Sequence, residues 1–192
     1  MAKPVYDEDL KQAVSVMRRG GIILYPTDTI WGIGCDAANS EAVRRIFELK
    51  RRSDSKAMLS LLDSDAKLGY YVPDIPDVAY DLMDLSEKPL TIIYDGVRHL
   101  APELIAQDGS AGIRITREEF SRDLCRLLGG AVVSTSANIS GSPSPRNFSE
   151  IDEAIIKGVD YVVSYRQNDH GLAKASSIIK LGSGGLVQVI RE

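Results

Sequence analysis

The 192-residue chain contains only two cysteines, Cys35 and Cys125, and these lack the close spacing of a zinc-binding motif. Its first residues lack the apolar core of a signal peptide, so we expect both thiols to stay reduced and disfavour a disulfide framework or a catalytic thiol. No apolar run approaches the ~20 residues that a membrane helix requires. We therefore expect a cytoplasmic protein without a membrane span.

The commonest nucleotide-binding motifs are also missing. The chain has neither the glycine-rich phosphate loop that ends in Gly-Lys-Ser/Thr nor a Gly-x-Gly-x-x-Gly turn between a strand and a helix. Asp and Glu form no run with metal-ligand spacing, so we expect no metal held by the protein alone. Any nucleotide site must therefore be of a less common kind.

Basic residues are not in excess, because 23 Lys and Arg stand against 27 Asp and Glu and give a formal net charge of -4. This balance disfavours a protein that mainly grips nucleic acid, since that affinity comes from neutralising phosphates with Lys and Arg. The content of 44% hydrophobic and 26% charged residues is ordinary for a globular protein. We expect one domain, residues 1–192.

Hydrophobic periodicity predicts helices and short strands in irregular order. Helices are expected over residues 9–19, 40–49, 64–70, 77–85, 118–128 and 149–157. Strands are expected over 22–25, 57–62, 90–94, 112–116, 131–134, 161–163, 175–180 and 186–190, with a hairpin turn at 182–185. Ser40 and Ser149 are the expected caps of two helices. Without strict β-α-β alternation, the pattern predicts a single α/β domain with a twisted, mixed sheet flanked by helices.

A polar cluster follows the first predicted strand. Two glycines precede this strand, Pro26 ends it, and Thr27, Asp28 and Thr29 come next, before two further glycines. Farther along, Arg114 lies in the middle of an apolar strand. Because an unpaired buried charge is too costly to keep, Arg114 is expected to pair with a structural carboxylate or to face an anionic ligand.

Two other segments allow both a functional and an ordinary interpretation. The basic run 50–52 ends a predicted helix, where cations are favoured by the backbone dipole at ~0.3–1 kcal/mol each. The hydroxyl-rich segment 134–145 follows a strand, where it could hold phosphates, but Ser, Asn, Gly and Pro also make ordinary surface loops. Neither segment indicates a site by itself.

Taken together, these segments resemble the YrdC/YciO family, and within it the threonylcarbamoyl-AMP synthases that prepare the carbamoyl group for the N6-threonylcarbamoyladenosine modification of tRNA. The matching segments are 20–21 with 25–34, 50–52, 112–114, 134–138 and 176–179. The resemblance implies one α/β domain with a twisted mixed sheet around a basic central cavity. It also implies a nucleotidyltransferase activity, that of an L-threonylcarbamoyladenylate synthase.

The resemblance assigns roles to individual residues and assigns none to a metal ligand. The residues implied as catalytic, from a Lys-x-Arg and a Ser-x-Asn motif, are Lys50, Arg52, Ser136 and Asn138. Those implied to bind threonine are Thr29, Arg114, Ser134 and Ser176. Those implied to approach the nucleotide are Arg52, Lys56, Ser110, Ser136, Ser144 and Arg191.

The implied substrates are ATP with Mg2+, L-threonine and bicarbonate or CO2. In the implied reaction, threonine forms a carbamate whose oxygen attacks the α-phosphorus and expels pyrophosphate. Because two anions must meet, such a site has to neutralise charge rather than supply a nucleophile. Further implied partners are RNA or tRNA and a downstream tRNA-modifying carbamoyltransferase complex.

The chain departs from the family pattern in two segments. Ser86-Glu87-Lys88-Pro89 stands where synthases usually have Trp-Pro-Gly-Pro, and Ala175-Ser176-Ser177 stands where many members have Pro-Ser-Thr. The C-terminal domain of the longer synthases is not expected after Arg191. Two alternatives therefore stay open, namely a non-enzymatic protein that binds double-stranded RNA and a YciO-like paralogue with another activity.

Overall fold

The computed structural model describes residues 4–51, 58–170, 175–182 and 186–192. Its α-helices are α1 (Asp7–Arg18), α2 (Ser40–Leu49), α3 (Leu68–Tyr71), α4 (Val78–Leu85), α5 (Glu119–Leu128) and α6 (Glu153–Gly158). Its strands are β1 (Ile23–Tyr25), β2 (Gly32–Gly34), β3 (Leu59–Leu62), β4 (Leu90–Tyr94), β5 (Ala111–Ile115), β6 (Val132–Ser136), β7 (Tyr161–Val162), β8 (Ser177–Leu181) and β9 (Val187–Arg191). Short 3-10 helices cover Asp65–Lys67, Pro102–Leu104 and Phe148–Glu150. Among these residues no helix is long and apolar enough to cross a membrane.

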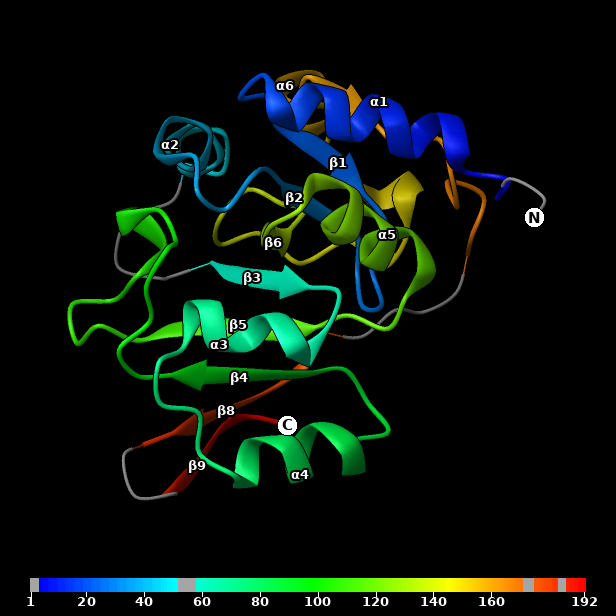
Figure 1. Ribbon diagram of the computed structural model, residues 1–192. Coiled ribbons are helices and arrows are strands. Elements are labelled where there is room, and N and C mark those ends of the chain that lie inside the picture. Colours follow the sequence, from blue (N-terminus) through cyan, green and yellow to red (C-terminus); the bar gives the residue numbers. More distant parts are fainter. Residues whose placement is uncertain (1–3, 52–57, 171–174, 183–185) are drawn as a thin grey trace.

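The strands of the described residues form one sheet in the order β7-β1-β2-β6-β3-β5-β4-β8-β9. Pairs β1/β7, β3/β5 and β4/β8 are parallel, whereas β1/β2, β2/β6, β3/β6, β4/β5 and β8/β9 are antiparallel. Figure 1 shows the sheet running from β1, beside α1, to β8 and β9 at its other end. The predicted fold, an α/β domain with a mixed sheet, is confirmed.

Apolar helix faces cover the sheet in two clusters. In one, Leu10 and Met17 of α1 and Phe120 and Leu124 of α5 pack with the buried Tyr25 of β1. Burial of such side chains contributes ~1.5–3 kcal/mol each, so the apolar spacing in the sequence determines which helix face turns inward.

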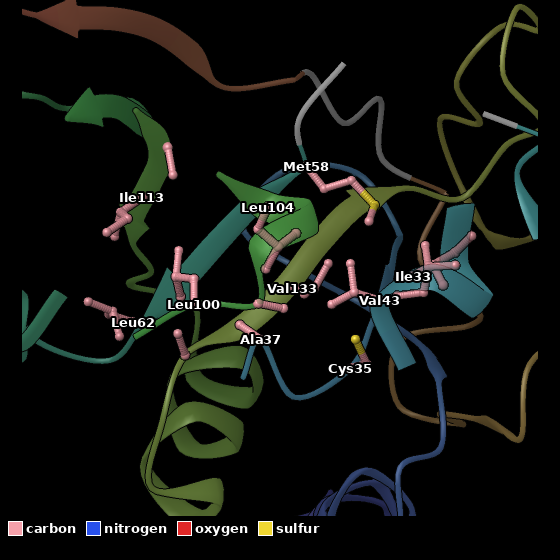
Figure 2. Close-up of a cluster of buried hydrophobic side chains, with 14 of the residues drawn as sticks. Ile33, Cys35, Ala37, Val43, Met58, Leu62, Leu100, Leu104, Ile113 and Val133 are labelled. Carbon is pink, nitrogen blue, oxygen red and sulfur yellow. The ribbon is translucent and has the colours of Figure 1, made fainter. Parts of the chain in front are cut away.

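The second cluster is larger and lies around α2 and the middle of the sheet. Figure 2 shows Val43 of α2 close to Ile33 of β2 and Val133 of β6. Cys35 belongs to this cluster and Cys125 to the first; both are free and buried, and burial raises the pKa of each thiol. Neither is placed to act as a nucleophile.

Both predicted caps were assigned to the wrong residue. The cap of α2 is Asn39, whose side chain accepts from the amide of Ala42 at 3.0 Å, while Ser40 begins the helix and donates to Glu103. The predicted helix over 149–157 begins only at Glu153, because Asp152 accepts from the amide of Ala154 at 2.7 Å. Near the start of each helix, more than one short polar side chain can act as the cap, so the sequence alone does not decide where the helix begins.

Most predicted elements exist, with shifted boundaries. The helix expected over 64–70 is a 3-10 turn, Asp65–Lys67, followed by the short α3. Strand β3 begins at Leu59, and part of its predicted span lies outside the described residues, as does most of the predicted turn at 182–185. Strand β2 was not predicted, because its sequence Gly-Ile-Gly carries little strand propensity.

Glycine is needed in β2 because neighbouring groups approach its backbone closely. A Cβ on Gly34 would lie 2.5 Å from the carbonyl oxygen of Val133 and 2.6 Å from the ring of Tyr25. The hydroxyl of Tyr25 donates to that same carbonyl at 3.0 Å, so the ring cannot move away without breaking a buried bond. Tyr25, Gly34 and Val133 therefore fix the packing of β1, β2 and β6.

We expect Gly34→Ala to lower the free energy of unfolding by about 1–3 kcal/mol, the usual cost of overpacking a core. Gly69→Ala in α3 is the matched control, because its added Cβ would meet no atom within 4 Å and alanine favours a helix. Urea unfolding followed by circular dichroism measures both. Equal stabilities of the two variants would contradict the close approach at Gly34.

Candidate functional site

A cavity of about 340 Å³ lies on the sheet. Its walls come from β2, β6, β3, β5, β4, β8 and β9, which are consecutive in the sheet order, together with the β1–β2 turn. Residues on alternate positions of one strand share a face, and this accounts for pairs such as Gly112 with Arg114 on β5 and Thr91 with Ile93 on β4. The sheet thus brings distant segments of the chain to one surface.

Eight of the residues that the sequence singled out line this cavity: Thr29, Ser110, Arg114, Ser134, Ser136, Ser144, Ser176 and Arg191. Lys50 and Asn138 are not among its lining residues. Arg52 and Lys56 lie outside the described residues. No carboxylate is among the described residues that line the cavity, so its charged groups are guanidinium groups.

Arg114 has a structural carboxylate as its partner, and it also lines the cavity. It is only 2% exposed, and its Nη2 lies 2.8 Å from Oδ1 of Asp28. Burial raises the pKa of Asp28, and the neighbouring Arg114 opposes that rise. The Nε of Arg114 has no hydrogen-bond partner among the described residues. Arg114 is therefore held by a carboxylate while part of its guanidinium is left for a ligand.

The hydroxyl of Thr29 is oriented by its neighbours. Oγ1 of Thr27 donates to the carbonyl of Ile30 at 2.8 Å, so in its 3.0 Å bond with Thr29 it must accept. Thr29 therefore donates its hydroxyl proton to Thr27, and it also accepts from Arg114 at 3.4 Å. Because a hydroxyl has one proton and two lone pairs, Thr29 can offer only a lone pair to the cavity.

Arg191 supplies the second guanidinium group. Its Nε and Nη2 donate to the carbonyl of Ser176 at 2.9 and 2.6 Å. Partial burial and the nearby charge of Arg114 lower the pKa of Arg191. Two guanidinium groups on one cavity repel each other, and an anion between them removes that repulsion.

Lys50 supports the cavity wall from behind. Its side chain is 1% exposed, and Nζ donates to the carbonyls of Ser136 and Asn138, the latter at 2.6 Å. Its own carbonyl accepts from the amide of Ser140 at 2.9 Å. The helix-end lysine therefore is not a solvated cation, since it holds the 136–140 loop in place.

Asn138 closes the same loop. Its Nδ2 donates to the carbonyls of Ile139 and Ser142 at 3.1 and 2.7 Å. It lines a neighbouring cavity of about 270 Å³ that also contains Ser144. Since Ser144 lines the main cavity as well, Asn138 lies next to the site.

The site contains residues that sequence reasoning did not select. Thr91 shares a 2.9 Å hydrogen bond with Ser176, and Asp28 pairs with Arg114. Trp31 also lines the cavity and packs on Phe148 with ring centroids 5.0 Å apart. The only signal for Asp28 was its place in the polar turn; Thr91 had none, because threonine is common in strands.

The atypical segment 86–89 lies away from the main cavity. It lines a separate cavity of about 300 Å³, and the carbonyl of Ser86 accepts from Arg117 at 3.0 Å. The next strand, β4, still provides Thr91 and Ile93 to the main cavity. Segment 86–89 therefore does not alter the lining of the main cavity, whereas the second departure places Ala175 on it, next to the retained Ser176. Among the described residues, no three His, Cys, Asp or Glu are placed to hold a metal ion.

Comparisons with known proteins agree with this geometry. The family model of Sua5, YciO and YrdC proteins, described as "Telomere recombination", matches residues 15–192. A threonylcarbamoyl-AMP synthase of Xanthomonas euvesicatoria is 34% identical over 190 residues, which cover 96% of this chain and 97% of the relative. A threonylcarbamoyl-AMP synthase of Thiobacillus denitrificans is 32% identical over 176 residues, or 90% of each chain.

Solved structures also resemble this chain. E. coli YciO has a TM-score of 0.84 at 25% identity, with 99% of this chain and 91% of that chain covered. The H234A/Y235A variant of P. abyssi Sua5 has a TM-score of 0.84 at 25% identity, with 95% of this chain and 55% of that chain covered. The match over residues 15–192 and the shared sheet establish that the chain belongs to the Sua5/YciO/YrdC family.

Proposed function

We propose that the protein is an L-threonylcarbamoyladenylate synthase. It forms threonylcarbamoyl-AMP and pyrophosphate from threonine, bicarbonate or CO2, and ATP, for the N6-threonylcarbamoyladenosine modification of tRNA. The observation that carries this proposal is the convergence of eight expected substrate-contacting residues, from segments far apart in the chain, on one cavity without a carboxylate. Relatives named threonylcarbamoyl-AMP synthase over more than 90% of this chain support it.

Threonine binds at the Thr29 end of the cavity. The guanidinium of Arg114 holds its carboxylate, and the ion pair with Asp28 keeps that guanidinium in place when the cavity is empty. The lone pair of Thr29 accepts from the amino group. Ser134 and Ser176 complete this end of the site. The amine is thereby directed toward the nucleotide, and it takes up bicarbonate or CO2 to give the carbamate.

ATP enters the same cavity with Mg2+ already on its phosphates. No carboxylate is among the described lining residues, so Mg2+ would be held by phosphate oxygens and water. Ser136 and Ser144 donate to phosphate oxygens, and Arg191, Arg52 and Lys56 offset their charge.

The reaction needs charge neutralisation and alignment. The carbamate oxygen attacks the α-phosphorus and pyrophosphate leaves, so negative charge accumulates on the phosphoryl oxygens. Donors held rigidly in advance stabilise that charge best. Lys50 and Asn138 serve this purpose by fixing the loop that carries Ser136, through the bonds to main-chain carbonyls described above.

A YciO-like activity is the second candidate, since E. coli YciO shares the sheet with a TM-score of 0.84. Against it, the atypical segment 86–89 is outside the main cavity, whose lining includes every described residue expected to bind threonine. Binding of RNA or tRNA, the downstream carbamoyltransferase complex and the cytoplasmic location stay predictions.

The first test is the reaction itself. Purified protein with ATP, Mg2+, bicarbonate and threonine is expected to release pyrophosphate and to form threonylcarbamoyl-AMP, detected by mass spectrometry. Omission of threonine is the control and should leave only background pyrophosphate. Threonine-independent release, or none at all, would favour the YciO-like alternative.

Thr29→Val keeps the shape of the side chain and removes its lone pairs. We expect KM for threonine to rise about two- to tenfold, the equivalent of one neutral hydrogen bond, with a smaller change of KM for ATP. Thr29→Ser keeps the hydroxyl and should bind threonine almost as well as the wild type. Equal effects of Thr29→Val on both substrates would contradict the placement of threonine.

Arg114→Lys keeps the charge but cannot form a bidentate pair with a carboxylate. We expect KM for threonine to rise at least tenfold, since a hydrogen bond to a charged group contributes about 1.5–3 kcal/mol. The matched control is Arg117→Lys on the same segment of chain, whose guanidinium donates to the carbonyls of Ser86 and Met83. An unchanged KM in Arg114→Lys would show that threonine binds elsewhere.

A further inference from the structure

Ser110 is a lining residue whose hydroxyl proton is already committed. Its Oγ donates to Oδ1 of Asp108 at 2.6 Å, and the same carboxylate oxygen accepts the amide of Ser110 at 3.0 Å. A carboxylate can only accept, so the direction of the Oγ bond is fixed. Ser110 is 5% exposed and lines the cavity, so what it can offer there is a lone pair.

Asp108 is held in the charged form that this arrangement requires. Nζ of Lys180, on β8, donates to its other oxygen at 2.6 Å and lies 3.7 Å from Asp95. These bonds, first that from Lys180 and then those from Ser110, hold the pKa of Asp108 well below its usual range. The carboxylate is therefore ionised and accepts from both groups.

Apolar residues line the cavity together with Ser110. Ile93 of β4 pairs in register with Gly112 of β5, two residues beyond Ser110, and lines the cavity. Ala106, whose amide donates to the carbonyl of Ser110 at 2.8 Å, and Ile178 of β8 line it as well. Apolar side chains and a hydroxyl that can only accept suit a flat base or a sugar better than a phosphate.

We propose that Ser110 presents a hydrogen-bond acceptor to the nucleoside part of the bound nucleotide and that Asp108 is the positioning residue that fixes this polarity. The inference rests on the proposed function, because it requires a nucleotide in the cavity. Phosphate oxygens are acceptors and would be repelled by the lone pair of Ser110. The group that meets Ser110 must donate a hydrogen.

Two groups of ATP qualify, the 6-amino group of adenine and a ribose hydroxyl. If the amino group is the donor, the site rejects a base with an oxygen at that position, since two acceptors would then face each other. If a ribose hydroxyl is the donor, the site rejects the deoxynucleotide. In either case Ser110 contributes to nucleotide selectivity, while the phosphates lie toward Ser136 and Ser144.

Calorimetric titration of the full chain with ATP, ITP, 2′-deoxy-ATP and 3′-deoxy-ATP, each with Mg2+, tests this inference without any need for turnover. We expect the wild type to bind ATP best. Ser110→Ala should weaken ATP about two- to tenfold, the equivalent of one neutral hydrogen bond. Ser110→Ala should weaken the binding of the nucleotide that lacks the donor much less. If the variant loses its preference for ATP over ITP, the donor is on the base; if it loses its preference for ATP over a deoxynucleotide, the donor is on the sugar.

The positioning role of Asp108 is tested by measuring nucleotide preference in Asp108 variants, with and without Ser110. Asp108→Ala frees the hydroxyl to rotate and should reduce the same preference. Asp95→Ala is the matched control, since Asp95 also lies near Lys180 but has no contact with Ser110 among its described interactions. In the Ser110→Ala background, Asp108→Ala should have no further effect on selectivity.

The results that would overturn the inference are equally specific. The proposed polarity is wrong if Ser110→Ala weakens all four nucleotides by the same factor or weakens none of them. It is also wrong if Asp108→Ala changes selectivity in the Ser110→Ala background. Failure of the wild type to bind any nucleotide would contradict it too. The pyrophosphate assay of the wild type is separate, so synthesis with unaltered selectivity in Ser110→Ala would retain the proposed function and reject this inference alone.

Discussion

The ion pair between Asp28 and Arg114 determines how the cavity is built. Asp28 belongs to the β1–β2 turn and Arg114 to β5, and β6 and β3 lie between β2 and β5 in the sheet. To bring the two charges within 2.8 Å, the turn has to fold back across the sheet face. Removing one partner would leave an uncompensated buried charge, at a cost of about 3–5 kcal/mol, so this path of the turn is strongly favoured.

The pair also sets the direction of the hydrogen bonds around it. Arg114 donates to Thr29, Thr29 donates to Thr27, and Thr27 donates to the carbonyl of Ile30. At the other end of the cavity, the carboxylate of Asp108 fixes Ser110 in the same manner. Hydroxyl groups that could donate or accept in isolation are therefore each limited to one role. A site without a catalytic nucleophile obtains its specificity from such fixed polarity.

Sequence reasoning predicted the residues that line this cavity better than the residues that hold the lining in place. Arg114 was recognisable because a charge in an apolar strand demands a partner or a ligand, and it has the first and is available to the second. Which carboxylate pairs with Arg114 depends on the path of a turn across the sheet, which no local pattern encodes. Lys50 looked like a solvated helix end because its acceptors, the carbonyls of Ser136 and Asn138, are about ninety residues away in the chain.

The fold shows the same contrast between features that local patterns predict and features that depend on distant contacts. Helix faces and buried strands were predictable from periodicity, as Leu10 with Met17 on α1 illustrates. Strand β2 was not, because its glycines are there to let Val133 and Tyr25 approach its backbone, a need that arises only once β6 pairs beside it.

The same distinction between lining and support bears on the choice between a synthase and a YciO-like protein. The segment 86–89, which departs from the synthase pattern, is joined to Arg117 by its main chain and lines another cavity. A change there can alter the packing of α4 against β4 while Thr91 still reaches the site and bonds to Ser176. An altered motif argues for an altered activity only when its residues contact the substrates. Segment 86–89 does not line the main cavity, whereas Ala175 of the second altered segment does, beside the retained Ser176.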